Sequence, residues 1–368
     1  MMGAEEKVRK LSEKADIRIN GNRPWDIQVH NNDFYSRILS QGTLGLGESY
    51  MDGWWDCERV DEMISKAIKA DLADEIKFNP VVIFAAVKAA IFNLADKTKA
   101  WVLGEHHYDV GNDLYKKMLD ERMIYTCGWW KDADNLEEAQ ENKLDLICRK
   151  LNLKEGMSVL DIGCGWGGFL KYAVKNYGVS GVGLTISKEQ AKLARKMCEG
   201  LPIEIKLKDY REEDNEYDRV VSIGMFEHVG WKNHKKYMKA VERCLKPESL
   251  SMLHTIGRNE STIMLEPWTK KYIFPTGTIP SIKQIGKSME GLLMMEDWHN
   301  FGPDYDKTLM SWYRNFNDSW DSLEGYDERF RRMWNYYLQS CAGAFRARRL
   351  QLWQIVLSNG VDGYRSIR

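Results

Sequence analysis

Short apolar runs alternate with amphipathic stretches through the second half of the chain. The runs are rich in Val, Ile and Leu and end in polar or glycine-containing segments, as buried strands do. The stretches between them, FLKYAVKNYG, SKEQAKLARKMCEG and KKYMKAVERCLKP, have helical spacing. This alternation predicts a parallel, doubly wound α/β sheet, to which the late segments EDWHNFG and LQLWQIVLSNG are expected to add edge strands. The predicted strands are MSVLDIG (157–163), SGVGLTI (180–186), IEIKLKDY (203–210), DRVVSIGM (218–225) and SLSMLHTIG (249–257).

The first hundred residues have a different pattern, with helical stretches and a polar, turn-rich segment (HNNDF, then QGTLGLGESYMDGWWD) but nothing that looks catalytic. We therefore expect a smaller, mainly helical domain over 1–100 and an α/β domain over 101–368. The most apolar run, 80–95, is shorter than the ~20 residues that a membrane-spanning helix needs. It contains Lys88, and we expect a buried or amphipathic helix. A helix that leans on a membrane surface is the alternative.

Composition excludes several classes of function. The chain has 368 residues, of which 43% are hydrophobic and 29% charged, and its formal net charge is −1. With almost no net charge, the protein has no overall positive electrostatic potential that would attract nucleic acid, so no nucleic-acid partner is expected. The seven cysteines form no C-x-x-C pair and no His/Cys cluster has zinc spacing, so we expect no metal site. Free thiols and a charged start that does not resemble a signal peptide predict a cytoplasmic protein.

A glycine-rich loop follows the first predicted strand and opens a helix, which is the context of the G-x-G-x-x-G dinucleotide fingerprint. An NAD site also needs an acidic residue at the end of the second strand, where this chain has Thr185. With Asp161 in front, the loop resembles instead the S-adenosylmethionine (SAM) loop of Rossmann-like methyltransferases. Asp209 ends the third strand, where such enzymes bind adenine. The sequence therefore predicts SAM rather than NAD; the fingerprint glycines are Gly163, Gly165 and Gly168.

Thr185 also departs from ordinary SAM methyltransferases, which carry an acid at that position. Ser187 and Gln190 lie close by in the sequence. The pattern indicates a subfamily in which Gln190 takes over the ribose hydroxyls.

From about residue 104 to the end, the chain resembles the bacterial cyclopropane-fatty-acid synthases and their mycolic acid relatives. The shared motifs, in order, are EHHYDVGNDLY, IYTCGWW, LDIGCGWGG, GLTISKEQ, GMFEHVG, LHTIG, KYIFP, EDWHNFG, DYDKTL and CAGAFRARRLQLWQ. The resemblance implies a class I SAM methyltransferase sheet with a helical cap. The N-terminal part looks like the accessory domain of the members that modify phospholipids. The SAM-binding residues that it implies are Tyr125, Thr126, Asp161, Gly163, Gly165, Gly167, Gly168, Thr185, Ser187, Gln190, Asp209, Tyr210 and Ile223.

The reaction implied by this resemblance transfers a methylene from SAM to the cis double bond of an unsaturated phospholipid acyl chain. An alkene is a weak nucleophile, so the pocket must hold it in line with the sulfonium methyl; positioning alone can supply roughly 7–11 kcal/mol. Methyl transfer creates a carbocation, from which water must be excluded. In the family a bound bicarbonate then removes a proton so that the ring closes.

The resemblance also implies the residues that hold this bicarbonate. His254 can donate to the anion, and Glu227 can accept the bicarbonate proton or orient its neighbours. The rings of Trp129, Tyr272 and Phe274 are candidates for stabilising the cation. Cys341 is either a catalytic thiol or a buried structural cysteine, and the structural role is favoured. The anion site carried over from the family is Cys127, Gly224, Glu227, His254, Ile256 and Tyr305.

Two further segments carry hypotheses. Residues 329–349 hold six arginines and no acid, which indicates either a solvated helix face or contacts with lipid phosphates, worth about 1 kcal/mol for each basic residue. Arg346 and Arg348 are the expected contacts. His106 and His107 lack metal-ligand partners at a set spacing. They open a segment that in the family folds over SAM and the acyl chain, so we expect a lid.

Three rival functions stay open. The first is a SAM methyltransferase of a small amine, since plant alkaloid N-methyltransferases share many motifs. The second is a lipid methyltransferase that gives a methyl-branched or methylene product. The third is a non-catalytic SAM- or lipid-binding protein. The favoured interpretation is an enzyme peripheral to the inner face of the membrane, whose N-terminal domain docks on the bilayer and mediates a homodimer.

Overall fold

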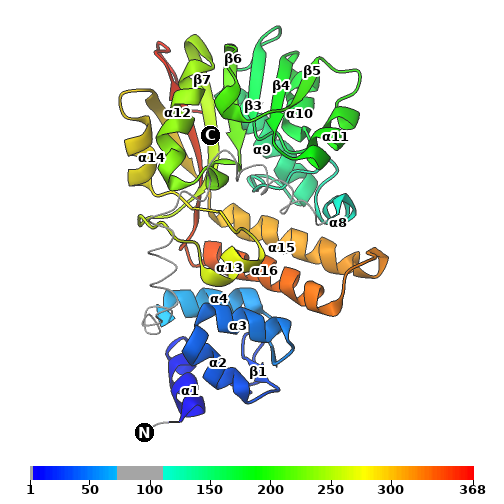
Figure 1. Ribbon diagram of the computed structural model, residues 1–368, viewed down its shortest axis with the longest axis vertical. Coiled ribbons are helices and arrows are strands. Elements are labelled where there is room, and N and C mark those ends of the chain that lie inside the picture. Colours follow the sequence, from blue (N-terminus) through cyan, green and yellow to red (C-terminus); the bar gives the residue numbers. More distant parts are fainter. Residues whose placement is uncertain (1–2, 73–110) are drawn as a thin grey trace. The chain divides into compact units, whose positions relative to one another are not determined.

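The computed structural model describes residues 3–72 and 111–368, which form two compact units that interleave along the chain. One unit combines residues 3–72 with Ile263–Pro275 and Tyr305–Leu350; the other combines 111–262 with Thr276–Asp304 and Gln351–Arg368 (Figure 1). Two segments from the second half of the chain thus belong to the compact unit of the N-terminal residues. The expected boundary at 100/101, the apolar run 80–95 and the pair His106 and His107 lie outside the described residues.

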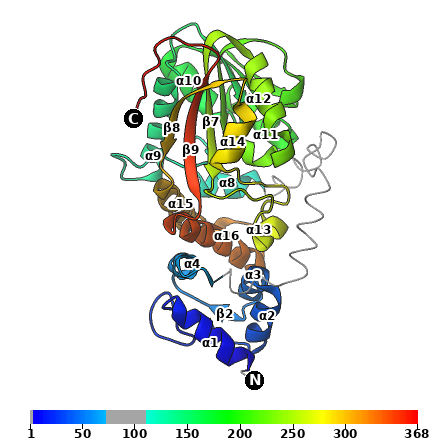
Figure 2. The same cartoon turned by 90° about the vertical axis from the view of Figure 1, so that its left-hand side faces the viewer.

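The second unit contains a seven-stranded sheet in the order β5-β4-β3-β6-β7-β9-β8. All strands predicted between 157 and 257 are present and run parallel. β9 is antiparallel to both neighbours and lies between β7 and β8, as Figure 2 shows. The expectation that both late segments form edge strands is therefore confirmed for β8 and wrong for β9. All eight residues of β9 are buried, which suits an interior strand. The bounds are β3 (Ser158–Ile162), β4 (Ser180–Thr185), β5 (Ile203–Leu207), β6 (Tyr217–Ile223), β7 (Leu245–Gly257), β8 (Met294–Asn300) and β9 (Gln351–Ser358).

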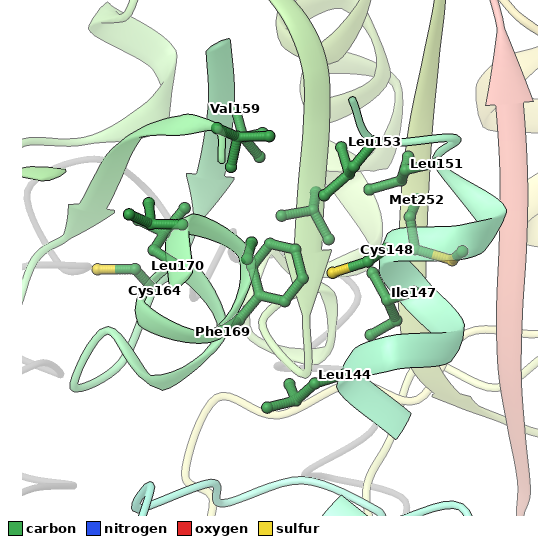
Figure 3. Packing of buried hydrophobic residues seen from close by; sticks show 14 of the residues in the cluster. Leu144, Ile147, Cys148, Leu151, Leu153, Val159, Cys164, Phe169, Leu170 and Met252 are labelled. Atoms are coloured by element: carbon green, nitrogen blue, oxygen red, sulfur yellow. The ribbon is translucent and has the colours of Figure 1, made fainter. Parts of the chain in front are cut away.

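Alternate side chains of these strands face two apolar clusters, because successive residues of a strand point to opposite faces of a sheet. Val159 and Val221 belong to the cluster with α9, α10 and α11, of which Figure 3 shows the packing around Phe169. Leu160 and Val220 belong to the other cluster, with α12 and α14. The helices of this unit are α8 (Asn112–Met118), α9 (Leu136–Lys150), α10 (Gly168–Tyr177), α11 (Lys188–Met197), α12 (His234–Arg243) and α14 (Ile282–Met289).

The first unit is mainly helical. α16 packs along α4 and α3, and Gly343 permits the close approach, because a Cβ there would lie 2.4 Å from the carbonyl oxygen of Asp61. Trp268 of α13 contacts the ring of Tyr336 in α16, with 4.6 Å between their centroids. The elements are α1 (Ala4–Lys14), β1 (Gln28–Val29), α2 (Asp33–Gln41), α3 (Thr43–Met51), β2 (Trp55–Asp56), α4 (Val60–Lys69), α13 (Pro267–Tyr272), α15 (Pro303–Asp318, with Tyr305 onward in this unit) and α16 (Glu328–Arg346).

Arg346 has an internal role in this unit. Its guanidinium pairs with the fully buried carboxylate of Asp61 at 2.6 Å and with Asp306 at 2.8 Å. The expectation that Arg346 contacts lipid phosphates is therefore wrong, because the buried Asp61 and the half-buried Asp306 engage its charge. Arg332 and Arg329 likewise pair with Asp56 and Asp52. No helix in the described part of the chain is long and apolar enough to cross a membrane.

Candidate active site

The predicted polar residues of the α/β unit gather where β3, β4, β5, β6 and β7 end. In parallel α/β sheets this edge is where ligands bind. Asp161 lies near the end of β3, Thr185 ends β4, Asp209 follows β5, Glu227 follows β6 and His254 is among the last four residues of β7. The sheet therefore brings the candidate SAM residues other than Tyr125 and Thr126, and four of the candidate anion residues, to the carboxyl ends of its strands.

The glycine loop has the conformation that its sequence predicts. The backbone N–H groups of Gly163 and Cys164 both donate to the carbonyl of Leu184 at 2.9 Å, which ties the loop to the end of β4. Gly163 has φ +85°, and a Cβ there would lie 2.5 Å from the side chain of Met225. Only glycine fits this position. Gly165 and Gly167 also have positive φ, and Gly168 opens α10.

Asp161 is almost completely buried, and burial raises the pKa of its carboxyl to about 7, against the lowering effect of Lys143. Its Oδ1 atom has no hydrogen-bond partner among the described residues. A buried acceptor without a partner is costly unless a ligand completes it. The loop and Asp161 together fit a ligand with a cationic ammonium or sulfonium group.

Three residues at the end of β4 are bound to one another. The Thr185 hydroxyl donates to Oε1 of Gln190 at 2.9 Å, and Ser187 caps α11 by accepting from the backbone N–H of Gln190. All three are buried. The structure thus fixes the Gln190 amide beside Thr185, and its role toward ribose stays a prediction.

Asp209 is held by a neighbour that the sequence analysis did not single out. Arg211 donates through Nε at 2.8 Å and through its backbone N–H at 2.9 Å to the Asp209 carboxylate. The next residue, Tyr210, packs edge-on against Tyr237, and burial raises the pKa of its phenol to about 12. The adenine contact expected of Asp209 stays a prediction.

The candidate anion residues of β6 and β7 are directly connected. Ile223 ends β6 and pairs in register with His254, and the N–H of Gly224 donates to the carbonyl of His254 at 2.9 Å. The N–H of Ile256 donates to Oε1 of Glu227 at 2.6 Å. Ile256 therefore orients the Glu227 carboxyl, and a direct contact of Ile256 with an anion stays a prediction.

Glu227 and His254 are buried and each presents one polar atom that has no partner among the described residues, Oε2 and Nε2 respectively. Burial raises the pKa of Glu227 to about 7, against the Ile256 N–H, which lowers it. Burial, reinforced by Lys143 and Lys150, holds the pKa of His254 well below its ordinary value, so the imidazole is neutral. A neutral imidazole and a carboxyl that can carry a proton are able to donate to a small anion.

Helix α9 holds the segment that carries Tyr125, Thr126 and Cys127. Gln140 donates to the carbonyl of Thr126 at 2.8 Å, and the fully buried Lys143 donates to its hydroxyl at 3.0 Å. Sequence reasoning missed both residues. The signal was present: Gln140 and Lys143 share the 3–4 spacing of the apolar positions of α9 and therefore belong to its buried stripe. Cys127 is buried, and its thiol donates to the carbonyl of Gly128.

Other candidates lie in the mainly helical unit. Tyr305 is buried against Phe345, with ring centroids 4.6 Å apart, and its anion role stays a prediction. Burial raises the pKa of the Cys341 thiol to about 12, which keeps it protonated and agrees with a structural role. Tyr272 donates to Glu48, and Phe274 packs edge-on against Tyr337.

Comparison with known proteins shows to which family the chain belongs. The family model of mycolic acid cyclopropane synthetase matches residues 95–355. The chain belongs to this family. A member from Escherichia coli (strain K12), the cyclopropane-fatty-acyl-phospholipid synthase, is 54% identical over 356 residues, which are 96% of this chain and 93% of the relative.

Solved structures agree with the assignment to the mycolic acid cyclopropane synthetase family. Mycolic acid cyclopropane synthase CmaA1, solved in complex with SAH and CTAB, has a TM-score of 0.65 and 29% identity, covering 70% of this chain and 98% of the other. Coclaurine N-methyltransferase has a TM-score of 0.69 over 86% of this chain and 99% of its own, but at 21% identity it shows the fold alone. The predicted enzyme class, a SAM-dependent methyltransferase, and its fold class are confirmed.

Proposed function

We propose that this enzyme is a cyclopropane-fatty-acyl-phospholipid synthase, which adds a methylene from SAM across the cis double bond of a phospholipid acyl chain. The observation that carries the proposal is the 54% identity to the E. coli enzyme of that name along 96% of the chain. This relative carries a phospholipid substrate in its name, and the identity to it is much higher than the 21% to coclaurine N-methyltransferase. This identity therefore supports a lipid substrate over a small amine.

The residues at the strand ends fit SAM. Asp161 offers an acceptor to its ammonium group, the glycine loop permits close approach of its backbone, and Gln190 offers an amide for the ribose hydroxyls. When bound, SAM supplies the electrophilic methyl group and bicarbonate supplies a base. The burial of Asp161, Glu227 and His254 supports the exclusion of water that this reaction requires.

The anion pocket of the α/β unit is proposed to be formed by Cys127, Gly224, Glu227, His254 and Ile256, and the anion role that the family resemblance implies for Tyr305 stays a separate prediction. The unpartnered Nε2 of His254 is able to donate to bicarbonate, and Glu227 with a pKa of about 7 is able to hold a proton at Oε2 and donate it. A protonated Glu227 avoids the repulsion that a carboxylate would exert on an anion. Trp129, which packs edge-on against His299 in the same unit, is a candidate for stabilising positive charge through its ring face.

The remaining parts of the proposal concern partners. We infer that the enzyme binds the membrane surface from the cytoplasmic side and forms a homodimer, with residues 1–100 contributing to both. Binding of the full chain to vesicles with unsaturated acyl chains, and sedimentation of the free chain, test these two parts separately. Failure to sediment with vesicles, or a monomer at micromolar concentration, contradicts the corresponding part.

The decisive experiment is mass spectrometry of acyl chains after incubation with methyl-labelled SAM and unsaturated phospholipid vesicles. The expected product is a labelled chain that gains one CH2 and resists hydrogenation. A labelled chain that gains CH2 but is still saturated by hydrogenation, or one that gains CH4 as a saturated methyl branch when a reductant is supplied, favours the alternative of a methylene or methyl-branched product. If no lipid is labelled although SAM still binds, the proposal is wrong and small amines are the next acceptors to test.

A further inference from the structure

A fully buried amide side chain on the adjacent strand β9 lies next to His254 of β7. His254 pairs in register with Gln354 of β9, and the Gln354 Nε2 atom lies 3.4 Å from Nδ1 of the imidazole. Both side chains are almost completely excluded from solvent. Gln354 interrupts an apolar strand, with Trp353 and Ile355 on either side.

An amide NH2 group in this position determines which ring nitrogen carries the proton. When it donates to Nδ1, that nitrogen must be the acceptor, so the proton of the neutral imidazole resides on Nε2. The reversed amide would accept from an Nδ1–H group and leave a lone pair on Nε2. Nε2 is the ring atom without a partner among the described residues.

We propose that Gln354 is a positioning residue that holds His254 in the Nε2–H tautomer, so that a hydrogen-bond donor points toward the anion pocket. The inference rests on the proposed function, in which His254 Nε2 donates to bicarbonate. It also accounts for the position of Gln354. A buried amide whose Oε1 atom has no partner among the described residues destabilises a sheet, and an apolar residue would pack there without that cost.

The tautomer is measurable without the reaction. Full-length protein labelled with 13C and 15N in histidine gives ring-nitrogen resonances that distinguish protonated from unprotonated nitrogens, and His254→Asn identifies the His254 signals. We expect wild type to show a protonated Nε2 and an unprotonated Nδ1. Gln354→Glu, examined at a pH high enough that its carboxyl is ionised and can only accept, should reverse the pattern. Gln354→Met, which neither donates nor accepts strongly, should give a mixture.

Activity provides a second readout. In Gln354→Glu and Gln354→Met we expect kcat to fall by roughly 10-fold or more, the scale of a misplaced proton donor, with the KM for SAM unchanged within twofold. Gln339→Leu removes a buried amide from α16 and serves as the control, with wild-type tautomer and kcat. Thermal unfolding identifies any variant that fails to fold. In that case the ring-nitrogen resonances of the wild-type protein still test whether His254 carries its proton on Nε2.

The outcomes separate the two proposals. An Nδ1–H tautomer in wild type, or the same tautomer in all folded variants, overturns the role of Gln354. If the tautomer shifts as expected but wild type makes no cyclopropane lipid, the role of Gln354 holds and the proposed function fails.

Discussion

Lys143 donates from its fully buried ammonium group to the hydroxyl of Thr126, with 3.0 Å between Nζ and Oγ1. Burial lowers the pKa of Lys143 to about 8, opposed by the charges of Asp120 and Asp161. The same ammonium lowers the pKa of Asp161. Lys143 of α9 therefore stabilises both the segment around Thr126 and the ionised form of Asp161, and both are expected at the SAM site.

Replacing Lys143 by Met should weaken SAM binding by about 10-fold. Thr126 loses a charged donor, an interaction worth roughly 1.5–3 kcal/mol, and without the nearby cation less of Asp161 is ionised at neutral pH. Calorimetric titration with SAM measures the effect. Lys154→Met, which removes an exposed lysine just after α9, is the matched control and should bind as wild type does. Equal affinities of the two variants would show that Lys143 has no role in SAM binding.

The pH dependence of stability should reveal Glu227. Its pKa rises from an ordinary 4.5 to about 7 in the folded chain, so between these values the folded protein keeps a proton that the unfolded chain has lost. The stabilisation is fully present below pH 4.5 and is lost as the pH rises through 7. Asp161 acts in the same direction.

Urea unfolding at pH 5 and pH 8 tests this expectation. The change in the free energy of unfolding from pH 5 to pH 8 should be about 2–3 kcal/mol more positive in Glu227→Gln than in wild type, because the variant lacks the loss of stability that ionisation of Glu227 causes. Glu290→Gln, at the exposed C-cap of α14, should retain the wild-type dependence. If Glu227→Gln shows the same pH dependence as wild type, Glu227 is ionised in the folded protein and its proposed donor role is wrong.

Gly224 should not tolerate a side chain. It has φ +70°, and a Cβ would lie 2.4 Å from Cγ2 of Thr126. Gly156 has φ +84° with open space around it, so Gly156→Ala incurs only the left-handed backbone cost of roughly 1–2 kcal/mol. Gly224→Ala should lose about 1–3 kcal/mol more by overpacking.

Adding Thr126→Ser to Gly224→Ala tests the cause of that loss. Serine lacks Cγ2 but keeps the hydroxyl that accepts from Lys143. The double variant should regain part of the stability in denaturant titrations. No recovery would mean that the clash with Thr126 is not the source of the destabilisation.

Arg346→Met should destabilise the mainly helical unit by about 2–3 kcal/mol, because removing one partner leaves a buried carboxylate undercompensated. Asp61 has no exposed side-chain surface and would keep only Arg59, at 2.8 Å. Arg349→Met, at an exposed position three residues later, is the control and should leave the unfolding midpoint unchanged. Equal midpoints for both variants would contradict the structural role of Arg346.

Much of the sheet could be predicted from the sequence because the deciding signals are local. Each strand from β3 to β7 is an apolar run, and the positive φ of Gly163 belongs to the glycine-rich loop itself. The place of β9 could not be predicted, since an apolar strand suits several pairings and β9 pairs with β7, about a hundred residues away in the chain.

The ion-pair partners of charged residues could not be predicted from the local sequence either. The arginines of α16 form a basic run in the sequence, but the acids that neutralise Arg346 come from α4 and α15. The strand-end positions of Glu227 and His254 followed from the motifs, whereas their contacts with Ile256 and Gln354 depend on the strand registers of the folded sheet.

The interior position of β9 constrains how the protein is made. Until Gln351–Ser358 leaves the ribosome, β7 has an unpaired edge and β8 has no strand beside it, so the apolar residues that later cover β9 remain accessible. Sheets closed by distant segments fold slowly and expose aggregation-prone surface in the meantime. The α/β unit is therefore completed after synthesis of its last strand, and a nascent chain stalled before residue 351 would be a natural client for chaperones.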